Sequence, residues 1–149
     1  MIPELRSAFV SAIVGGLVAY GFQYYGEART LKKTARLETV LEYTKAESPI
    51  TPFATKYIAA ITGNGDLKTA QVELRGKVAD EMERAEKLKT LFSTAAPDIE
   101  QYVTALSMFG DSIDNATDAT KMRIWTERFG HVVDTRMALE RSLLRAAGA

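Results

Sequence analysis

The stretch SAFVSAIVGGLVAYGFQYYG, residues 7–26, decides the class of this protein because it holds no charged side chain. A helix of this length rises about 1.5 Å per residue and is about 30 Å long, which matches the hydrocarbon thickness of a bilayer. Aromatic rings, which favour the membrane interface, gather at its carboxyl end: Tyr20, Phe22, Tyr24 and Tyr25. The stretch therefore predicts a transmembrane helix.

Two other interpretations of this stretch are weaker. A cleaved secretory signal is one, since Gly26-Glu27-Ala28 loosely resembles a cleavage site, but the preceding MIPELR is only weakly basic and the apolar run is longer than usual in signals. A buried helix of a soluble protein is the other. The longest remaining apolar run, Tyr57 to Ile61, has only five residues. A core helix formed by residues 7–26 would therefore be far more apolar than the helices that it packs against. We therefore expect a retained span.

Small residues recur four positions apart within the span and form two neighbouring ridges. Such ridges let a second helix approach closely in a membrane. We expect them to form a packing face for another membrane protein or for a second copy of this chain. The residues are Ala8, Ala12 and Gly16 on one ridge and Ser11, Gly15 and Ala19 on the other.

Basic residues follow the span more densely than they precede it. Only Arg6 lies before it, whereas Arg29, Lys32, Lys33 and Arg36 lie directly after it. This bias predicts contact with anionic headgroups and places the C-terminal domain in the cytoplasm. The whole chain has 19 basic and 19 acidic residues, so its net charge gives no electrostatic attraction to nucleic acid, and we expect no nucleic-acid partner.

The pattern of the remaining chain predicts an all-α fold. Residues 1–26 form a tail and the transmembrane helix, and residues 27–149 are expected to form one domain. No glycine or proline interrupts the chain between Glu27 and Ser48, so the span is expected to continue as a helical extension. Turn residues and 3.6-residue periodicity divide the rest into helices, and short connections favour an antiparallel bundle of four to five helices. The expected helical segments are 27–47, 52–62, 66–93, 98–115 and 118–146.

Three polar residues stand on apolar helix faces. Gln71 and Glu81 interrupt the apolar seam of 66–93, and we expect both at the edge of the buried stripe. Arg136 shares a stripe with apolar neighbours, so it is expected either to extend its charged group to the surface or to pair with Glu140 or with an acid on a neighbouring helix, and it is a candidate contact for a partner.

The search for chemistry gives no positive motif. The chain has no cysteine, which excludes thiol chemistry, and its one histidine, His131, has only Glu127 as a nearby potential ligand. A cation strip is a weak possibility at Asp111, Asp114 and Asp118. We predict no catalytic residue, no metal, no cofactor and no enzymatic activity. An aromatic stripe is expected to be core rather than a ligand pocket: Tyr102, Met108, Phe109, Trp125 and Phe129.

The function classes that remain all depend on the span. The first is a non-enzymatic accessory or scaffold subunit that packs its span against a larger membrane protein. The second is a homo-oligomerising, membrane-permeabilising or pore-forming protein, although the span offers little polar surface to line a water path. A membrane-anchored ligand sensor is the third.

Overall fold

The computed structural model describes residues 30–45, 48–63, 65–116 and 118–148. The regular structure in these ranges is helical, which confirms the prediction of an all-α bundle. The predicted span, its small-residue ridges, its aromatic residues and Arg29 lie outside the described residues. Within the described ranges, no helix has both the length and the apolarity needed to cross a bilayer.

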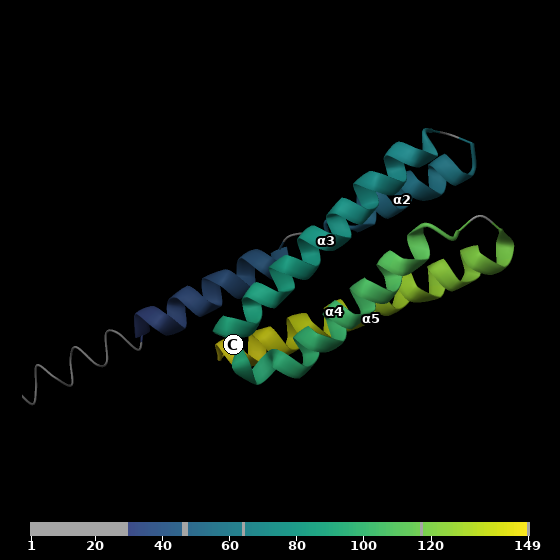
Figure 1. Ribbon diagram of the computed structural model, residues 1–149. Helices are drawn as coiled ribbons and strands as arrows, with labels where there is room; N and C mark the ends of the chain where they lie inside the picture. Colours follow the sequence, from purple (N-terminus) through teal and green to yellow (C-terminus); the bar gives the residue numbers. More distant parts are fainter. Residues whose placement is uncertain (1–29, 46–47, 64, 117, 149) are drawn as a thin grey trace, which may run out of the picture.

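Five helical segments and one 3₁₀ turn make up the described chain. The first helix covers residues 30–45. It is followed by α2 (Thr51–Ile61), α3 (Leu67–Leu91), the 3₁₀ turn η1 (Ser93–Ala95), α4 (Ala96–Ile113) and α5 (Ala119–Ala147). Figure 1 shows that helix 30–45 and α2 follow one another in nearly the same direction. Each of the helices α3, α4 and α5 runs antiparallel to the helix before it (Figure 1).

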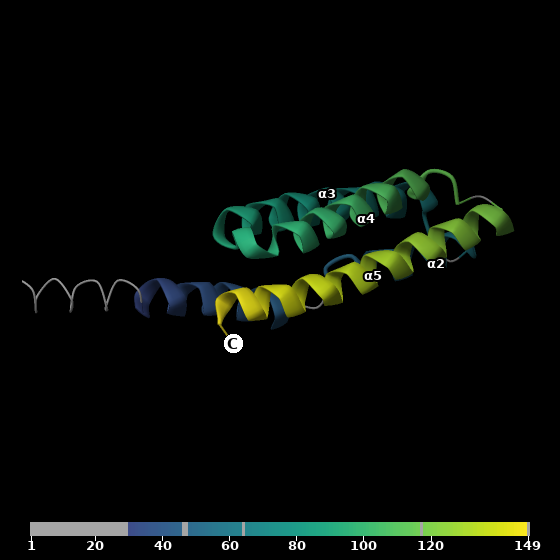
Figure 2. The same cartoon turned by 90° about the horizontal axis from the view of Figure 1, so that it is seen from below.

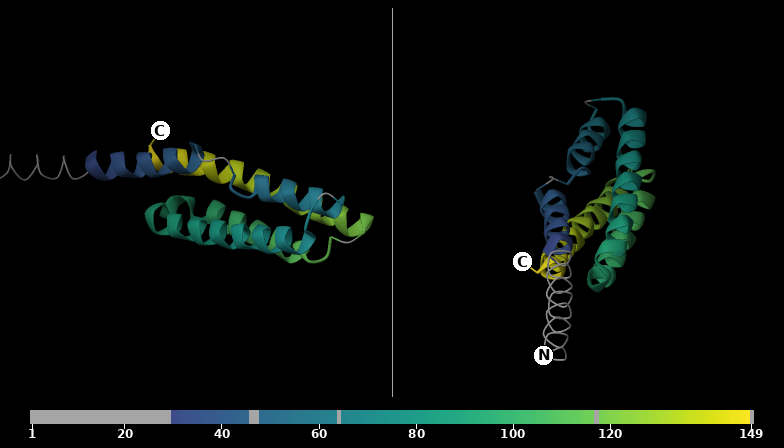
Figure 3. Two further views of the ribbon diagram at one scale, coloured as in Figure 1. Left: turned by 90° about the horizontal axis from the view of Figure 1, so that it is seen from above. Right: turned by 90° about the vertical axis from the view of Figure 1, so that its left-hand side faces the viewer.

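The arrangement is a two-layered, up-and-down bundle in which helix 30–45 and α2 together take the place of the first long helix. Figure 2 and the left view of Figure 3 show α3 and α4 on one side and helix 30–45, α2 and α5 on the other. Ser48-Pro49 lies in the break between helix 30–45 and α2. The helix is interrupted there because the residue before a proline is disfavoured in helical geometry. The end of α5 lies alongside helix 30–45, whose first described turns extend beyond it (Figures 1 and 2).

Helix ends are set by local chemistry. The Asp66 carboxylate accepts a hydrogen bond from the Lys68 backbone N–H at 3.0 Å, and the Asp118 carboxylate accepts one from the Lys121 backbone N–H at 3.0 Å. Both acids thereby satisfy backbone donors that the first turn of a helix leaves unpaired. Gly148 ends α5 with a φ of 82°, a left-handed conformation in which glycine avoids strain.

The turn between α3 and α4 differs from the expected connection. α3 ends at Leu91, and α4 already begins at Ala96, with the 3₁₀ turn between them. Phe92 leaves helical geometry there, with φ −129° and ψ 65°, and its ring is buried in the core. Burial of this ring explains why the connection is a compact turn rather than a longer helix end.

One apolar core runs through the bundle and draws on every described helix. Gly110 lies inside a continuous α4, and a Cβ atom there would sit 3.6 Å from Val78 Cγ1 of α3, so these two helices pack closely. The largest apolar or aromatic side chains that are fully buried are Tyr43, Ile50, Leu74, Ile99, Tyr102, Leu106, Phe109, Ile113, Trp125, Leu139 and Leu143.

Candidate functional site

Glu81 lies in the centre of the bundle and is only 1% exposed. The expectation that it sits at the edge of the buried stripe is wrong. The buried positions of α3 include Leu74, Val78, Ala85 and Leu88, and their alternating spacing of four and three residues places Glu81 in the middle of the row. A carboxylate in this position requires partners, because an unpaired buried charge is strongly unfavourable.

Three side chains from three other helices converge on one oxygen of Glu81. Its Oε1 atom accepts hydrogen bonds from the Tyr43 hydroxyl at 2.9 Å, the Tyr102 hydroxyl at 3.1 Å and Nη1 of Arg136 at 3.3 Å. Because these donors come from helix 30–45, α4 and α5, one carboxylate joins four helices. We refer to Tyr43, Glu81, Tyr102 and Arg136 as the buried polar network.

Arg136 is the second charge of this network and is 6% exposed. Its Nε donates to Glu140 Oε1 at 2.9 Å, and its Nη1 pairs with Glu81. The expected pairing with Glu140 and with an acid of a neighbouring helix is therefore confirmed. Because the side chain lies inside the bundle, any effect of Arg136 on a partner would pass through the helices that it connects.

The guanidinium of Arg136 also holds helix 30–45. Its Nη2 donates to the Tyr43 carbonyl at 3.4 Å, and its central carbon lies 5.1 Å from the centroid of the Tyr43 ring. The Arg84 guanidinium lies 4.9 Å from the same centroid. Cations within about 6 Å of an aromatic ring are attracted to its face. Tyr43 is thus held through its ring, its hydroxyl and its backbone.

Burial controls the protonation of the two tyrosines. It raises the pKa of the Tyr43 hydroxyl well above its usual range, and the neighbouring Tyr102 and Glu81 raise it further. Burial also raises the pKa of Tyr102, again with a contribution from Glu81. Both hydroxyls therefore stay protonated and donate to the carboxylate. The second oxygen of Glu81 has no hydrogen-bond partner among the described residues.

Such a network fixes the relative position of helices more than it adds stability. Removing two opposite charges from water costs nearly as much as their attraction returns. The geometry is nevertheless specific, because a shift of any of the four helices would separate a donor from Glu81. The described arrangement has the chemistry of a structural junction between helix 30–45 and the three long helices.

The predicted aromatic core is largely confirmed and lies in the half of the bundle nearer the α4–α5 connection. Tyr57, Phe109, Trp125 and Phe129 pack with ring centroids 5.2 to 5.8 Å apart. Tyr102 belongs instead to the buried polar network. Met108, which we expected in the core, is 45% exposed.

The weak metal candidates do not form a cluster. α4 ends at Ile113, so the three acids of the possible cation strip do not share a continuous helix. Asp114 accepts a hydrogen bond from Gln71 at 2.6 Å and pairs with Arg75, while Asp118 caps α5. In the part of the chain that the structure describes, no three potential metal ligands come together.

No hydrogen bond or ion pair joins the lone histidine to Glu127, its only nearby potential fellow ligand. His131 is exposed on α5. Glu127 pairs with Arg123 at 2.8 Å instead. This pair spans one turn on the outer face of α5, as is common for exposed charges on helices.

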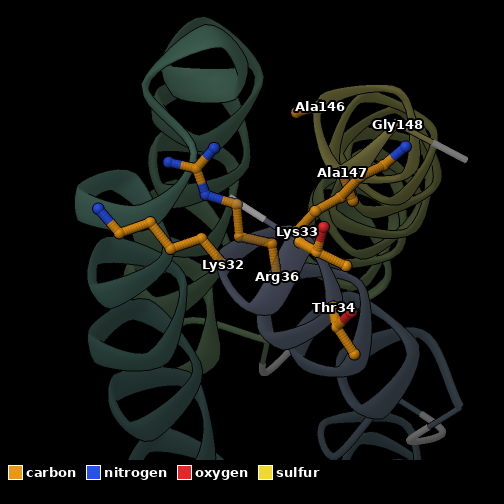
Figure 4. A pocket seen from close by; sticks show the side chains of 8 residues that line it. Lys32, Lys33, Thr34, Arg36, Ala146, Ala147 and Gly148 are labelled. Atoms are coloured by element: carbon orange, nitrogen blue, oxygen red, sulfur yellow. The ribbon is translucent and has the colours of Figure 1, made fainter. Parts of the chain in front are cut away.

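Three of the predicted interface cations lie at the start of helix 30–45. Lys32, Lys33 and Arg36 are exposed and line an open pocket together with the end of α5 at Ala146 to Gly148. Figure 4 shows the Lys33 side chain reaching toward Gly148. A Cβ atom at Gly148 would lie only 3.0 Å from Lys33 Cε, so the two elements are in close contact. The ammonium also suits the partial negative charge at the end of a helix.

Fold and site together define a helical bundle in which a buried carboxylate ties an N-terminal helix to three long helices. Comparison with protein families, with curated proteins and with solved structures finds no match for this chain.

Proposed function

We propose that this chain is a non-enzymatic, single-pass membrane protein that serves as an accessory or scaffold subunit of a larger membrane complex. In this proposal residues 7–26 cross the bilayer and the bundle stands on the cytoplasmic side. The observation that carries the proposal is the buried polar network, because it fastens the helix that follows the apolar stretch to the rest of the bundle.

The network supports this function through the position of its contacts. The described part of the helix that follows the apolar stretch starts at Thr30, four positions after Gly26, and is held near its far end by Glu81 and Arg136 through Tyr43. Near its start, Lys33 lies against Gly148 of α5. A helix held at both ends cannot swing freely, so a partner that positions the membrane stretch would also position the bundle.

The small-residue ridges supply the proposed partner face. Interfaces between membrane helices are rich in small residues because close approach increases van der Waals contact. The face consists of Ala8, Ala12 and Gly16 on one ridge and Ser11, Gly15 and Ala19 on the other.

Extraction in mild detergent at native expression, followed by identification of co-purifying proteins, tests the proposal. We expect a defined partner with the unaltered chain and a strong loss of that partner with Gly16→Ile, which places bulk on the ridge. Val10→Ile adds bulk on the opposite side of the same helix and should leave the complex intact. Emergence of the chain alone and monomeric would contradict the proposal. Pure homo-oligomers that leak ions in liposomes would favour the permeabilising function instead.

A further inference from the structure

Figures 1 and 2 show α5 finishing alongside helix 30–45, at what we call the proximal end of the bundle. Five exposed cations lie on these two helices near that end. Lys32, Lys33 and Arg36 come from the helix, as the sequence predicts. Arg141 and Arg145 come from the last turns of α5, more than 100 positions away in the chain. All five side chains belong to exposed residues.

These five cations lack acidic partners among the described residues. No described carboxylate lies within 4.0 Å of their charged groups, and the Nε atoms of Arg141 and Arg145 donate to backbone carbonyls of α5. Five cations farther from this end are each paired with an acid. These pairs are Lys56–Glu73, Arg75–Asp114, Lys77–Asp80, Lys121–Asp118 and Arg123–Glu127. The five proximal cations named above therefore have no described carboxylate within 4.0 Å, whereas Lys87 and Lys89, which lie near the same end of the bundle, pair with Glu83 and Glu100.

The proximal cations line two open pockets. Lys32, Lys33 and Arg36 line the one in Figure 4, beside the end of α5. Arg141 and Arg145 line the other, together with Leu144 and Ala138 of α5 and the carboxylate-bearing Asp98 of α4. Ammonium and guanidinium groups at the edge of a concave surface suit phosphate groups.

We infer that the proximal end docks on anionic phospholipid headgroups through both helices, so that the end of α5 rests on the membrane surface. The inference rests on the proposed membrane attachment. The four residue steps from Gly26 to Thr30 span at most about 14 Å in any conformation, so the surface that residues 7–26 enter lies within reach of this end. Each cation near an anionic surface contributes about a fivefold gain in membrane association.

The test uses the full chain in vesicles, with one cysteine added after Ala149 and labelled with an environment-sensitive fluorophore. The chain contains no other cysteine, so the label is unique. In vesicles containing phosphatidylglycerol we expect strong quenching by nitroxide groups placed at headgroup depth. In pure phosphatidylcholine we expect weak quenching. The double variant Arg141→Gln/Arg145→Gln should reduce the docked-to-undocked ratio in phosphatidylglycerol by about 25-fold.

The matched control is Lys121→Gln/Arg123→Gln, which removes the same charge from the first turns of α5 and should quench like the unaltered chain. Equal quenching in the two lipids, or equal effects of the two double variants, overturns the inference. Retention of the chain in the vesicles after alkaline extraction is measured in parallel. If the chain is retained but quenching does not depend on the lipid, only the docking of α5 is contradicted. If the chain is lost from the vesicles, the membrane attachment is contradicted as well.

Discussion

The hydroxyl of Tyr43 donates a hydrogen bond to Oε1 of Glu81 at 2.9 Å, joining residues 38 positions apart in the chain. Tyr43 is 1% exposed and belongs to the helix that follows the apolar stretch, while Glu81 belongs to the middle of α3. This contact makes helix 30–45 a fixed part of the bundle rather than a free stalk.

Removal of the Glu81 carboxylate is expected to destabilise the bundle strongly. Glu81→Ala leaves two buried hydroxyls and part of the Arg136 guanidinium without their acceptor, at a cost of about 3 to 5 kcal/mol in the free energy of unfolding. Denaturant unfolding of the full chain in mild detergent, followed by circular dichroism, measures this cost.

The control for this variant is Glu83→Ala on the same helix. Glu83 is exposed and pairs with Lys87 at 2.6 Å, an arrangement for which a cost below about 1 kcal/mol is expected. Replacing both buried charges, as Glu81→Met/Arg136→Met, should restore part of the lost stability, because no buried charge is left unpaired, although the Tyr43 and Tyr102 hydroxyls still lack their acceptor. If the double variant has as low a free energy of unfolding as Glu81→Ala, unpaired charge does not explain the loss of stability.

Loss of the Tyr43 hydroxyl should loosen helix 30–45 selectively. Tyr43→Phe keeps the ring in place but removes one hydrogen bond to a charged acceptor, worth about 1.5 to 3 kcal/mol. We expect faster amide hydrogen exchange in residues 30–45 and little change in α5. Tyr102→Phe removes the neighbouring hydrogen bond from α4 and serves as the control. Equal exchange in helix 30–45 for the two variants would contradict the role assigned to Tyr43.

Stability is expected to fall in alkaline solution because of the two network tyrosines. Burial raises the pKa of Tyr43 and of Tyr102 above their usual value near 10, so the native state keeps protons that the unfolded chain loses. Their stabilising contribution is complete below about pH 10. Above that pH, the free energy of unfolding should fall by about 1.4 kcal/mol per pH unit for each tyrosine, until the pH reaches their native values.

Denaturant unfolding between about pH 9 and 11 checks this slope. The double variant Tyr43→Phe/Tyr102→Phe should show a shallower decline than the unaltered chain, because both linked protons are removed. Parallel declines for the two proteins would mean that other groups account for the alkaline sensitivity.

Gly110→Ala is expected to stabilise α4 by up to about 1 kcal/mol, because alanine restricts the unfolded chain and favours the helix. The added methyl would meet Val78 Cγ1 at 3.6 Å, an ordinary contact. Gly148→Ala is the opposite case, since Gly148 has a φ of 82° and a methyl there would crowd Lys33. A fall in melting temperature for Gly110→Ala would show that the α3–α4 contact tolerates no added atom.

Helical periodicity predicted the all-α bundle because it depends on local sequence. Proline and glycine mark the breaks, and the helix caps at Asp66 and Asp118 follow the usual preference for acids at that position. The connection after Phe92 was less predictable. Its compact 3₁₀ turn depends on burial of the ring, which only the tertiary packing decides.

The buried polar network could be predicted only in part. Arg136 on an apolar stripe signalled a buried pair, and Glu140 one turn away was an obvious partner. Glu81 gave the same signal on α3 but was interpreted as an edge residue, because one helix alone does not reveal what faces it. No local pattern singled out Tyr43, whose hydrogen-bond partners lie on α3 and α5. Convergence of four helices on one carboxylate is set by long-range packing that a sequence pattern does not encode.

Alkaline extraction of membranes that contain the full chain tests the central claim most directly. We predict that the unaltered chain stays in the membrane fraction, that Leu17→Arg releases it by placing a charge in the middle of the apolar stretch, and that the exposed Leu31→Arg on helix 30–45 does not. Release of the unaltered chain into the soluble fraction would contradict the account of this protein as a bundle fixed to a membrane-crossing helix.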